Sequence, residues 1–195
     1  MIPYHNLNFL IATCFGFGKL GKIFKCPGTI GSIIAFPIAY YLFSLVITIC
    51  QLLGFTNLIS FPLFVIPCII LVILLFFIGA FGAGRYAKML VKEDPGEIII
   101  DEVVGQMLCA ILSLPFAVGF LMAKVPMDLL LIGSILINLL LFRLFDIFKP
   151  WPINWFDKNI KGGFGIMLDD IIAAIFAAVV YNVLLIMLVN HLNAM

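Results

Sequence analysis

The charged side chains that could do chemistry are concentrated in residues 142–170, which read FRLFDIFKPWPINWFDKNIKGGFGIMLDD. This stretch holds cations, carboxylates and closely spaced glycines, namely Arg143, Asp146, Lys149, Asp157, Lys158, Lys161, Gly162, Gly163, Gly165, Asp169 and Asp170. Ionisable residues in an apolar membrane chain are costly, and they are therefore functional candidates. Cations, carboxylates and a glycine-rich turn together indicate a site that binds a phosphate group and a divalent metal ion.

Two pairs of adjacent acids, Asp101-Glu102 and Asp169-Asp170, are the candidate catalytic residues and metal ligands, together with Asp146. Magnesium binds carboxylate oxygens, keeps several waters and takes further ligands from substrate phosphates. Neighbouring residues on a helix point about 100° apart, so each pair can direct one carboxylate inward. The alternative is that acids in a first helical turn only complement the helix dipole, which stabilises by about 0.3–1 kcal/mol. The repetition of the pair favours metal binding.

Arg143, Asp146 and Lys149 are spaced three residues apart, which places them on one face of a helix. We interpret Asp146 as a metal ligand and the two cations as ligands of phosphate oxygens, because guanidinium and ammonium groups form charge-assisted hydrogen bonds to phosphate. The alternative is a local ion pair between Arg143 and Asp146, with Lys149 extending to the lipid headgroups.

Two glycine-containing segments are candidate substrate-binding loops. Their residues are Gly28, Thr29, Gly31 and Ser32 before one predicted helix, and Gly162 and Gly163 before another. Glycine lets backbone N–H groups turn towards an anion, and a helix N-terminus favours negative charge. The alternative is that both segments are ordinary turns and helix caps.

Other phosphatase chemistries are disfavoured by what the chain lacks. Its only histidines are His5 and His191, at opposite ends, which argues against histidine acid–base chemistry or a phosphohistidine. No cysteine is followed six residues later by arginine, as the cysteine-phosphatase loop requires, and no D-x-D-x-[TV] motif is present. Metal-assisted chemistry carried by carboxylates remains.

The composition is that of an integral membrane protein. The chain is 65% hydrophobic and 11% charged, with a mean hydropathy of +1.27, whereas a soluble domain is about half apolar and a quarter charged. The net charge of +1 argues against nucleic acid binding. Five scattered cysteines without a C-x-x-C pair argue against a zinc site or a disulfide framework. We expect no cleavable signal peptide and treat residues 1–195 as one domain.

The hydropathy pattern predicts an all-α, polytopic membrane helical bundle. Five spans are expected, at about residues 33–53, 61–83, 103–122, 129–145 and 166–189. Residues 6–17 are apolar but shorter than the roughly 20 residues that a span needs, so we predict an interfacial or re-entrant helix there. The alternative is that this first segment is a sixth crossing.

The lysines and arginines predict the orientation, because cytoplasmic loops of membrane proteins are enriched in them. Five spans with a cytoplasmic N-terminus place all but one of the basic residues on the cytoplasmic side. The same arrangement brings both acid pairs, the charges near residue 143 and the glycine segment at residues 28–32 to one membrane face. We therefore predict a single cavity at the level of the lipid headgroups.

Three segments, CPGTIGS, IIIDEVVGQ and FRLFDIFKPWPINWFDKNIKGGFGIMLDDIIAA, resemble the phosphatidylglycerophosphatase A family in content and in order, over nearly the whole chain. The resemblance implies a magnesium-dependent enzyme of the bacterial inner membrane with its active site facing the cytoplasm. Its reaction would be removal of the terminal phosphate of phosphatidylglycerophosphate to give phosphatidylglycerol, in phosphatidylglycerol and cardiolipin biosynthesis. Its partners would be the phospholipid substrate and the bilayer, and the oligomeric state is left open.

By motif, the family's positions correspond to Gly28, Thr29, Gly31, Ser32, Asp101, Glu102, Gly105, Arg143, Asp146, Lys149, Pro150, Gly162, Gly163, Gly165, Asp169 and Asp170. The chain departs from the family in two places. Cys26 stands where Ala or Val usually precedes Pro-Gly-Thr, and Glu93-Asp94 stands where the family often carries His-Asp. The second departure argues against an essential histidine there.

Two rival functions are weighed against a phosphatase. A lipid headgroup phosphotransferase would use similar residues, but the D-G-x-x-A-R pattern of the CDP-alcohol enzymes is absent. A small transporter would need polar residues near the middle of its spans. The predicted span centres are almost purely apolar, with Ser134 and Asn138 as the main exceptions.

Overall fold

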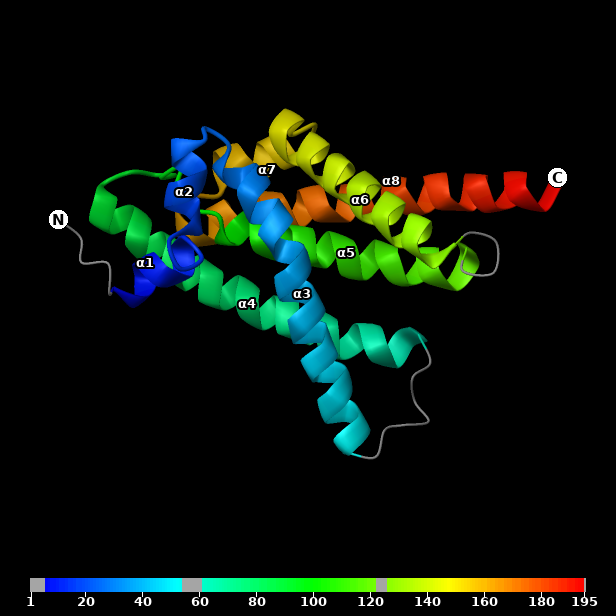
Figure 1. Ribbon diagram of the computed structural model, residues 1–195. Coiled ribbons are helices and arrows are strands. Elements are labelled where there is room, and N and C mark those ends of the chain that lie inside the picture. Colours follow the sequence, from blue (N-terminus) through cyan, green and yellow to red (C-terminus); the bar gives the residue numbers. More distant parts are fainter. Residues whose placement is uncertain (1–5, 54–60, 122–125, 195) are drawn as a thin grey trace.

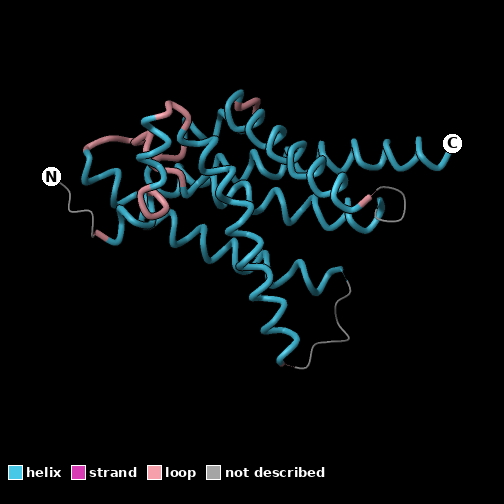
Figure 2. The backbone as a smooth tube through the Cα atoms, viewed as in Figure 1, coloured by secondary structure: helices cyan, strands magenta, loops and turns pink. Residues whose placement is uncertain are grey.

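The computed structural model describes residues 6–53, 61–121 and 126–194, and all regular structure in these ranges is helical (Figures 1 and 2). The loop after the first predicted span and the end of the third at Met122 lie outside the described residues. The helices are α1 Leu7–Ala12, α2 Phe17–Ile23, α3 Pro27–Leu52, α4 Phe61–Leu90, α5 Ile100–Leu121, α6 Met127–Phe148, α7 Ile153–Asn159 and α8 Gly162–Ala194. The prediction of an all-α membrane bundle is confirmed.

Among the described residues, four segments are long and apolar enough to cross a membrane: Pro27–Leu45, Val65–Leu90, Asp128–Phe148 and Gly162–Ala194. The third predicted span coincides with α5, which has 22 residues but is not one of these four. Helix α5 packs against α3, α4, α6 and α8, so it occupies the centre of the bundle. A central position explains why the helix that begins with two acids can hold them inside the protein.

The contact between α5 and α8 is the most extensive in the bundle. Helix α8 presents small buried side chains at helical spacing, namely Ala173, Ala174, Ala177 and Ala178. Helix α5 meets them with larger buried side chains that include Val103, Val104, Met107 and Cys109. Small residues allow membrane helices to approach closely, because no large side chain separates the two backbones.

The N-terminal segment contains a short helix as predicted, α1, but this helix ends at Ala12 rather than near residue 17, and a second short helix, α2, follows it. Positive φ angles at Cys14, Phe15 and Gly16 separate α1 from α2. Neither helix, of 6 and 7 residues, is long enough to be a sixth crossing. The pair packs against α4 and α3 and is joined to the segment before α5, where the Ile99 N–H donates to the Ala12 carbonyl at 3.0 Å.

Two helices begin earlier than predicted, because Pro27 and Gly162 are their first residues rather than Ile33 and Ile166. Proline suits the first position of a helix, since its missing N–H would have no partner there. Glycines lower helix propensity, which is why the sequence favoured turns in both places. Tertiary packing outweighs that preference. A Cβ at Gly163 would collide with the Ala80 carbonyl of α4, so glycine is required for helix contact there.

The N-terminal ends of α3, α5 and α8 and the C-terminal ends of α4 and α6 lie at one end of the bundle, on the left in Figure 1. Helices α1, α2 and α7 are at that same end. The prediction that the charged segments converge on one side of the bundle is therefore confirmed.

Candidate active site

A cavity of about 150 Å³ opens at the charged end of the bundle. Its walls come from the loop after α4, the first turn of α5, the end of α6, α7 and the beginning of α8. The lining residues are Glu93, Asp94, Asp101, Glu102, Asp146, Lys149, Asp157, Ile160, Lys161, Gly162, Gly165, Ile166, Asp169 and Asp170. Eight carboxylates against two ammonium groups make this cavity strongly acidic.

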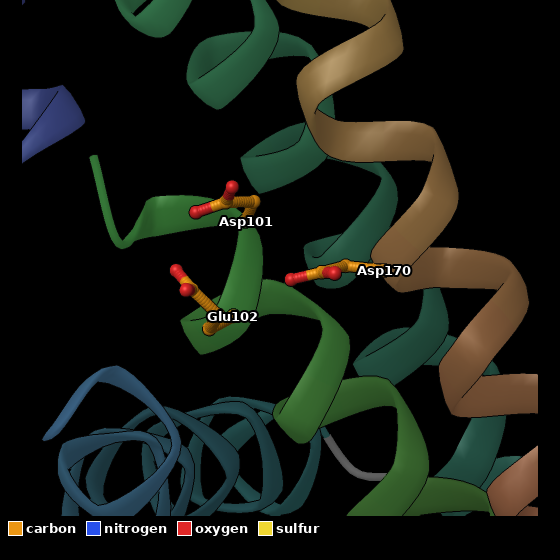
Figure 3. Close-up of side chains that lie close together, drawn as sticks. All are labelled: Asp101, Glu102 and Asp170. Carbon is orange, nitrogen blue, oxygen red and sulfur yellow. The ribbon is translucent and has the colours of Figure 1, made fainter. Parts of the chain in front are cut away.

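Asp101 and Glu102 of α5 and Asp170 of α8 lie close together (Figure 3), and all three line the cavity. One carboxylate oxygen from each lies within 4.8 Å of the other two. Each residue also has a buried oxygen without a hydrogen-bond partner: Asp101 Oδ1, Glu102 Oε2 and Asp170 Oδ2. Buried polar atoms are normally paired, and converging carboxylates with oxygens left unpaired are the ligands that a hard divalent cation takes. The donor set therefore fits a metal ion such as magnesium.

The two acid pairs occupy different positions along their helices. Asp101 and Glu102 lie in the first turn of α5, where they also complement the helix dipole. The first turn of α8 contains no acid, because Asp169 and Asp170 lie two turns in. The dipole alternative therefore does not account for the second pair. Helix α8 comes close to α5 at Gly105, whose added Cβ would lie 3.1 Å from the Cβ of Asp170.

Arg143 donates to Asp146 in a local ion pair, and its Nη1 lies 4.0 Å from Glu102 Oε1. The guanidinium group packs against α3 at Gly28. A Cβ there would collide with Glu102 Oε1 and lie 2.7 Å from Arg143 Nη1. Glycine at this position therefore makes room for the pair of Arg143 and Glu102. Arg143 does not line the cavity, and its contact with phosphate remains a prediction.

Lys149 is the C-terminal cap of α6, with a φ of 41° in the left-handed region. Its ammonium donates to Asp157 at 2.8 Å and to Asp169 of α8. Burial disfavours the charged form of Lys149, but these two hydrogen bonds outweigh it and raise its pKa. An ammonium group has three donors, so one remains for a ligand in the cavity.

Four lining residues with charged side chains were missed as site residues in the sequence: Glu93, Asp94, Asp157 and Lys161. Asp157 lies on α7, and the packing of α7 against α8 places the Asp157 carboxylate beside the Lys149 ammonium group. Although Asp94 is partly exposed, desolvation raises its pKa; Lys149 opposes the rise, and the nearby carboxylates Asp157 and Asp146 add to it. The available signal was that Asp157 and Lys161 lie inside the charged stretch, and that Glu93-Asp94 replaces a family motif.

Of the predicted site residues, seven line the cavity: Asp101, Glu102, Asp146, Lys149, Gly162, Asp169 and Asp170. The others do not line it: Gly28, Thr29, Gly31, Ser32, Arg143 and Gly163. Residues 28–32 lie in the first turns of α3, so the interpretation of a loop before the helix is wrong. The Ser32 hydroxyl donates to the Gly28 carbonyl at 3.0 Å, which uses its proton within the helix. A role for these residues in substrate binding remains a prediction.

Comparison with known proteins places these residues in a family. The family model for phosphatidylglycerophosphatase A matches residues 10–185. Phosphatidylglycerophosphatase A of Escherichia coli (strain K12) is 32% identical over 182 residues, covering 90% of this chain and 80% of that protein. The protein of the same name in Haemophilus influenzae (strain Rd) is 34% identical over 174 residues, covering 89% and 87%.

A putative phosphatidylinositol-3-phosphatase of Bacteroides thetaiotaomicron is 30% identical over 177 residues, covering 91% of this chain and 92% of that protein. No solved structure matches the chain significantly. The match extends from α1 to α8 and therefore includes every helix that contributes to the acidic cavity. The chain belongs to the phosphatidylglycerophosphatase A family and is a membrane-embedded phosphatase, a phosphoric monoester hydrolase.

Proposed function

We propose that the protein hydrolyses the terminal phosphate of phosphatidylglycerophosphate, with Mg²⁺ as its metal ion, at the cytoplasmic face of the bacterial inner membrane. The names of the Escherichia coli and Haemophilus influenzae relatives support this substrate. The observation that supports a bound metal ion is the excess of carboxylates in the cavity lining, which has eight carboxylates and two ammonium groups. A phosphomonoester is itself an anion, so it cannot enter such a cavity without cations that neutralise both partners.

Three of the five predicted metal ligands are better placed than the other two. Asp101, Glu102 and Asp170 have carboxylates that converge, and each has one buried oxygen without a hydrogen-bond partner. Asp146 and Asp169 already accept from Arg143 and Lys149. We therefore assign the metal to the first three, with the unpaired Oδ1 of Asp169 as the next available ligand. When bound, the ion would supply charge neutralisation and Lewis-acid polarisation of the phosphate oxygens.

The remaining cavity residues bind and orient the substrate. The third donor of the Lys149 ammonium is available to a phosphate oxygen, while Asp157 and Asp169 hold the amine in place. Arg143 holds Asp146 and limits the movement of Glu102. Asp94 lines the same cavity and forms no ion pair with another described residue, so its carboxylate is available to accept the proton of the attacking water.

The test is release of inorganic phosphate from phosphatidylglycerophosphate by the protein purified in neutral detergent. We expect release that requires added Mg²⁺ and stops with EDTA. Phosphatidylinositol 3-phosphate is the comparison substrate, because the Bacteroides relative carries that name. Faster turnover of that lipid would overturn the substrate assignment. Labelled phosphate on an alcohol acceptor instead of in solution would identify a phosphotransferase.

A further inference from the structure

A second hollow, of about 440 Å³, adjoins the acidic cavity at the C-terminal end of α4. The two share Glu93 and Gly162 in their linings, so they are neighbours along one wall. Apart from Glu93, the charged side chains in the second hollow are Lys88 and Lys92. The sign of the charge therefore reverses between two adjoining concave surfaces.

The two lysines of the second hollow lack carboxylate partners in the described part of the chain. Glu93, the acid that lines the same hollow, pairs with Lys161 at 3.5 Å on the side of the acidic cavity. No ion pair involves Lys88 or Lys92 in the same residues. Two uncompensated ammonium groups in a concave surface are suited to an anionic oxygen ligand.

The backbone that carries these lysines is held in an unfavourable conformation. The Lys92 N–H bonds to the Ala87 carbonyl at 3.1 Å and the Val91 N–H to the Lys88 carbonyl at 3.2 Å, which is the Schellman pattern of a helix C-terminus. Val91 takes the left-handed position that usually belongs to glycine, with a φ of 53° and 91% exposure. A β-branched residue there is an outlier. Such strain is found at ligand sites, and this turn places Lys88 and Lys92 in one hollow.

We propose that this hollow binds the phosphodiester of the lipid substrate while the acidic cavity holds the phosphomonoester, an inference that rests on the proposed function. Phosphatidylglycerophosphate carries both groups, separated by one glycerol unit. The diester has a single negative charge and needs no metal ion, so two ammonium groups suffice for it. The adjoining hollows of opposite charge thereby select a lipid with two phosphates over one with a single phosphate.

The test compares wild type with Lys88→Gln/Lys92→Gln in neutral detergent, where no anionic bilayer contributes to binding. Loss of charge-assisted hydrogen bonds should raise KM for phosphatidylglycerophosphate about tenfold and leave kcat within about twofold. Phosphatidylglycerol keeps the diester and lacks the monoester, so its Ki as an inhibitor should rise about tenfold as well. The Ki of inorganic phosphate should not change.

Two control variants accompany the pair. Lys88→Arg/Lys92→Arg keeps both charges and should retain the wild-type KM. Lys25→Gln/Lys158→Gln removes two exposed lysines outside both hollows and should have no effect. An unchanged Ki for phosphatidylglycerol, or an equal rise for phosphatidylglycerol and inorganic phosphate, would overturn the subsite. A wild-type protein that does not hydrolyse phosphatidylglycerophosphate would instead overturn the proposed function, while direct titration with dihexanoyl phosphatidylglycerol would still measure binding to the hollow.

Discussion

Asp170 is the residue on which the metal assignment depends most, because it brings α8 to the acid pair of α5. Its carboxylate converges with those of Asp101 and Glu102, and its Oδ2 is buried without a partner. An amide in its place would supply one neutral oxygen and an N–H₂ group that repels a cation. The side chain would keep its volume, so packing should be preserved.

We expect Asp170→Asn to lower kcat by at least about 100-fold with little change in the thermal unfolding midpoint, since the ion's ligand set is incomplete. Phosphate release and thermal unfolding in detergent are the two measurements. Asp128→Asn, at an exposed position in the first turn of α6, is the matched control and should retain activity. Full turnover by the Asp170 variant would remove this residue from the mechanism.

Gly28 affects the site through the space that it leaves. An alanine Cβ would collide with Glu102 Oε1 and approach Arg143, so both side chains must move. We expect Gly28→Ala to lower activity about tenfold or more and to raise the Mg²⁺ concentration for half-maximal rate, because Glu102 is a proposed ligand. Titration of activity with Mg²⁺ is the measurement.

Gly133→Ala is the control for that prediction, because nothing lies within 4 Å of a Cβ at residue 133. Alanine also favours helix by roughly 1 kcal/mol over glycine, so this variant should be at least as stable as wild type. If Gly28→Ala had wild-type Mg²⁺ dependence, the close contact between α3 and the Glu102–Arg143 pair would have no role in the site.

At the scale of elements, the α1–α2 hairpin supports the segment that leads into α5. Lys22 of α2 donates to buried Glu97 at 2.6 Å, and the Tyr86 hydroxyl of α4 donates to the other carboxylate oxygen at 3.1 Å. Burial would raise the pKa of Glu97, but these hydrogen bonds outweigh it and lower the pKa below 4.5. Glu97 is therefore charged in the folded protein at neutral pH, and it connects three elements four residues before Asp101.

A lowered pKa means that the Glu97 interactions stabilise the fold fully above its ordinary value and are lost as the pH falls through the folded-state value. We expect Glu97→Gln to lose about 1 kcal/mol at pH 7 and to approach wild-type stability as the pH drops below 4.5. Thermal unfolding as a function of pH is the measurement. A difference that stayed constant down to pH 3 would show that the charge of Glu97 does not contribute.

At the scale of the whole molecule, the charged ends of the helices lie at one end of the bundle, so the active site should face only one side of the membrane. Lys158 belongs to α7, which lies at the same end of the bundle as the acidic cavity, whereas Asp128 lies in the first turn of α6, at the opposite end of the bundle. We expect Lys158→Cys to react with a membrane-impermeant maleimide only after the inner membrane is permeabilised. Asp128→Cys should react in intact spheroplasts.

Both variants require a background in which the five natural cysteines are replaced and activity is retained. Labelling of the Lys158 variant in intact spheroplasts would contradict the predicted orientation and would place the acidic cavity on the periplasmic side. The proposed site chemistry would survive that result, because it depends on the contacts among helices and not on the side of the membrane.

Much of this protein could be predicted from sequence because hydropathy and charge are local properties. Apolar runs of span length predict helices wherever they occur, and the distribution of lysine and arginine predicts that the charged ends share one side. Asp101, Glu102, Asp169 and Asp170 could be chosen as candidate site residues because they are charges in an apolar chain, and all four line the cavity. The helix starts at Pro27 and Gly162 could not be predicted from sequence. Glycine favours a turn in any sequence-based prediction, and the neighbouring helix that requires glycine at these positions is seen only in the structure.

Only the tertiary structure decided which charges meet. Asp101, Glu102 and Asp170 converge, whereas Asp169 accepts from Lys149, and no local pattern distinguishes Asp169 from the three converging acids. The pairing of Asp146 with Arg143 was one of the two alternatives that their spacing allowed. Asp157 joined the site through the packing of α7 against α8. The physical reason is that carboxylates separated by many residues are placed within a few ångströms of one another by helix contacts. Those contacts depend on glycines and alanines, and the need for a small residue at each position becomes visible only when the helix packed against it is known.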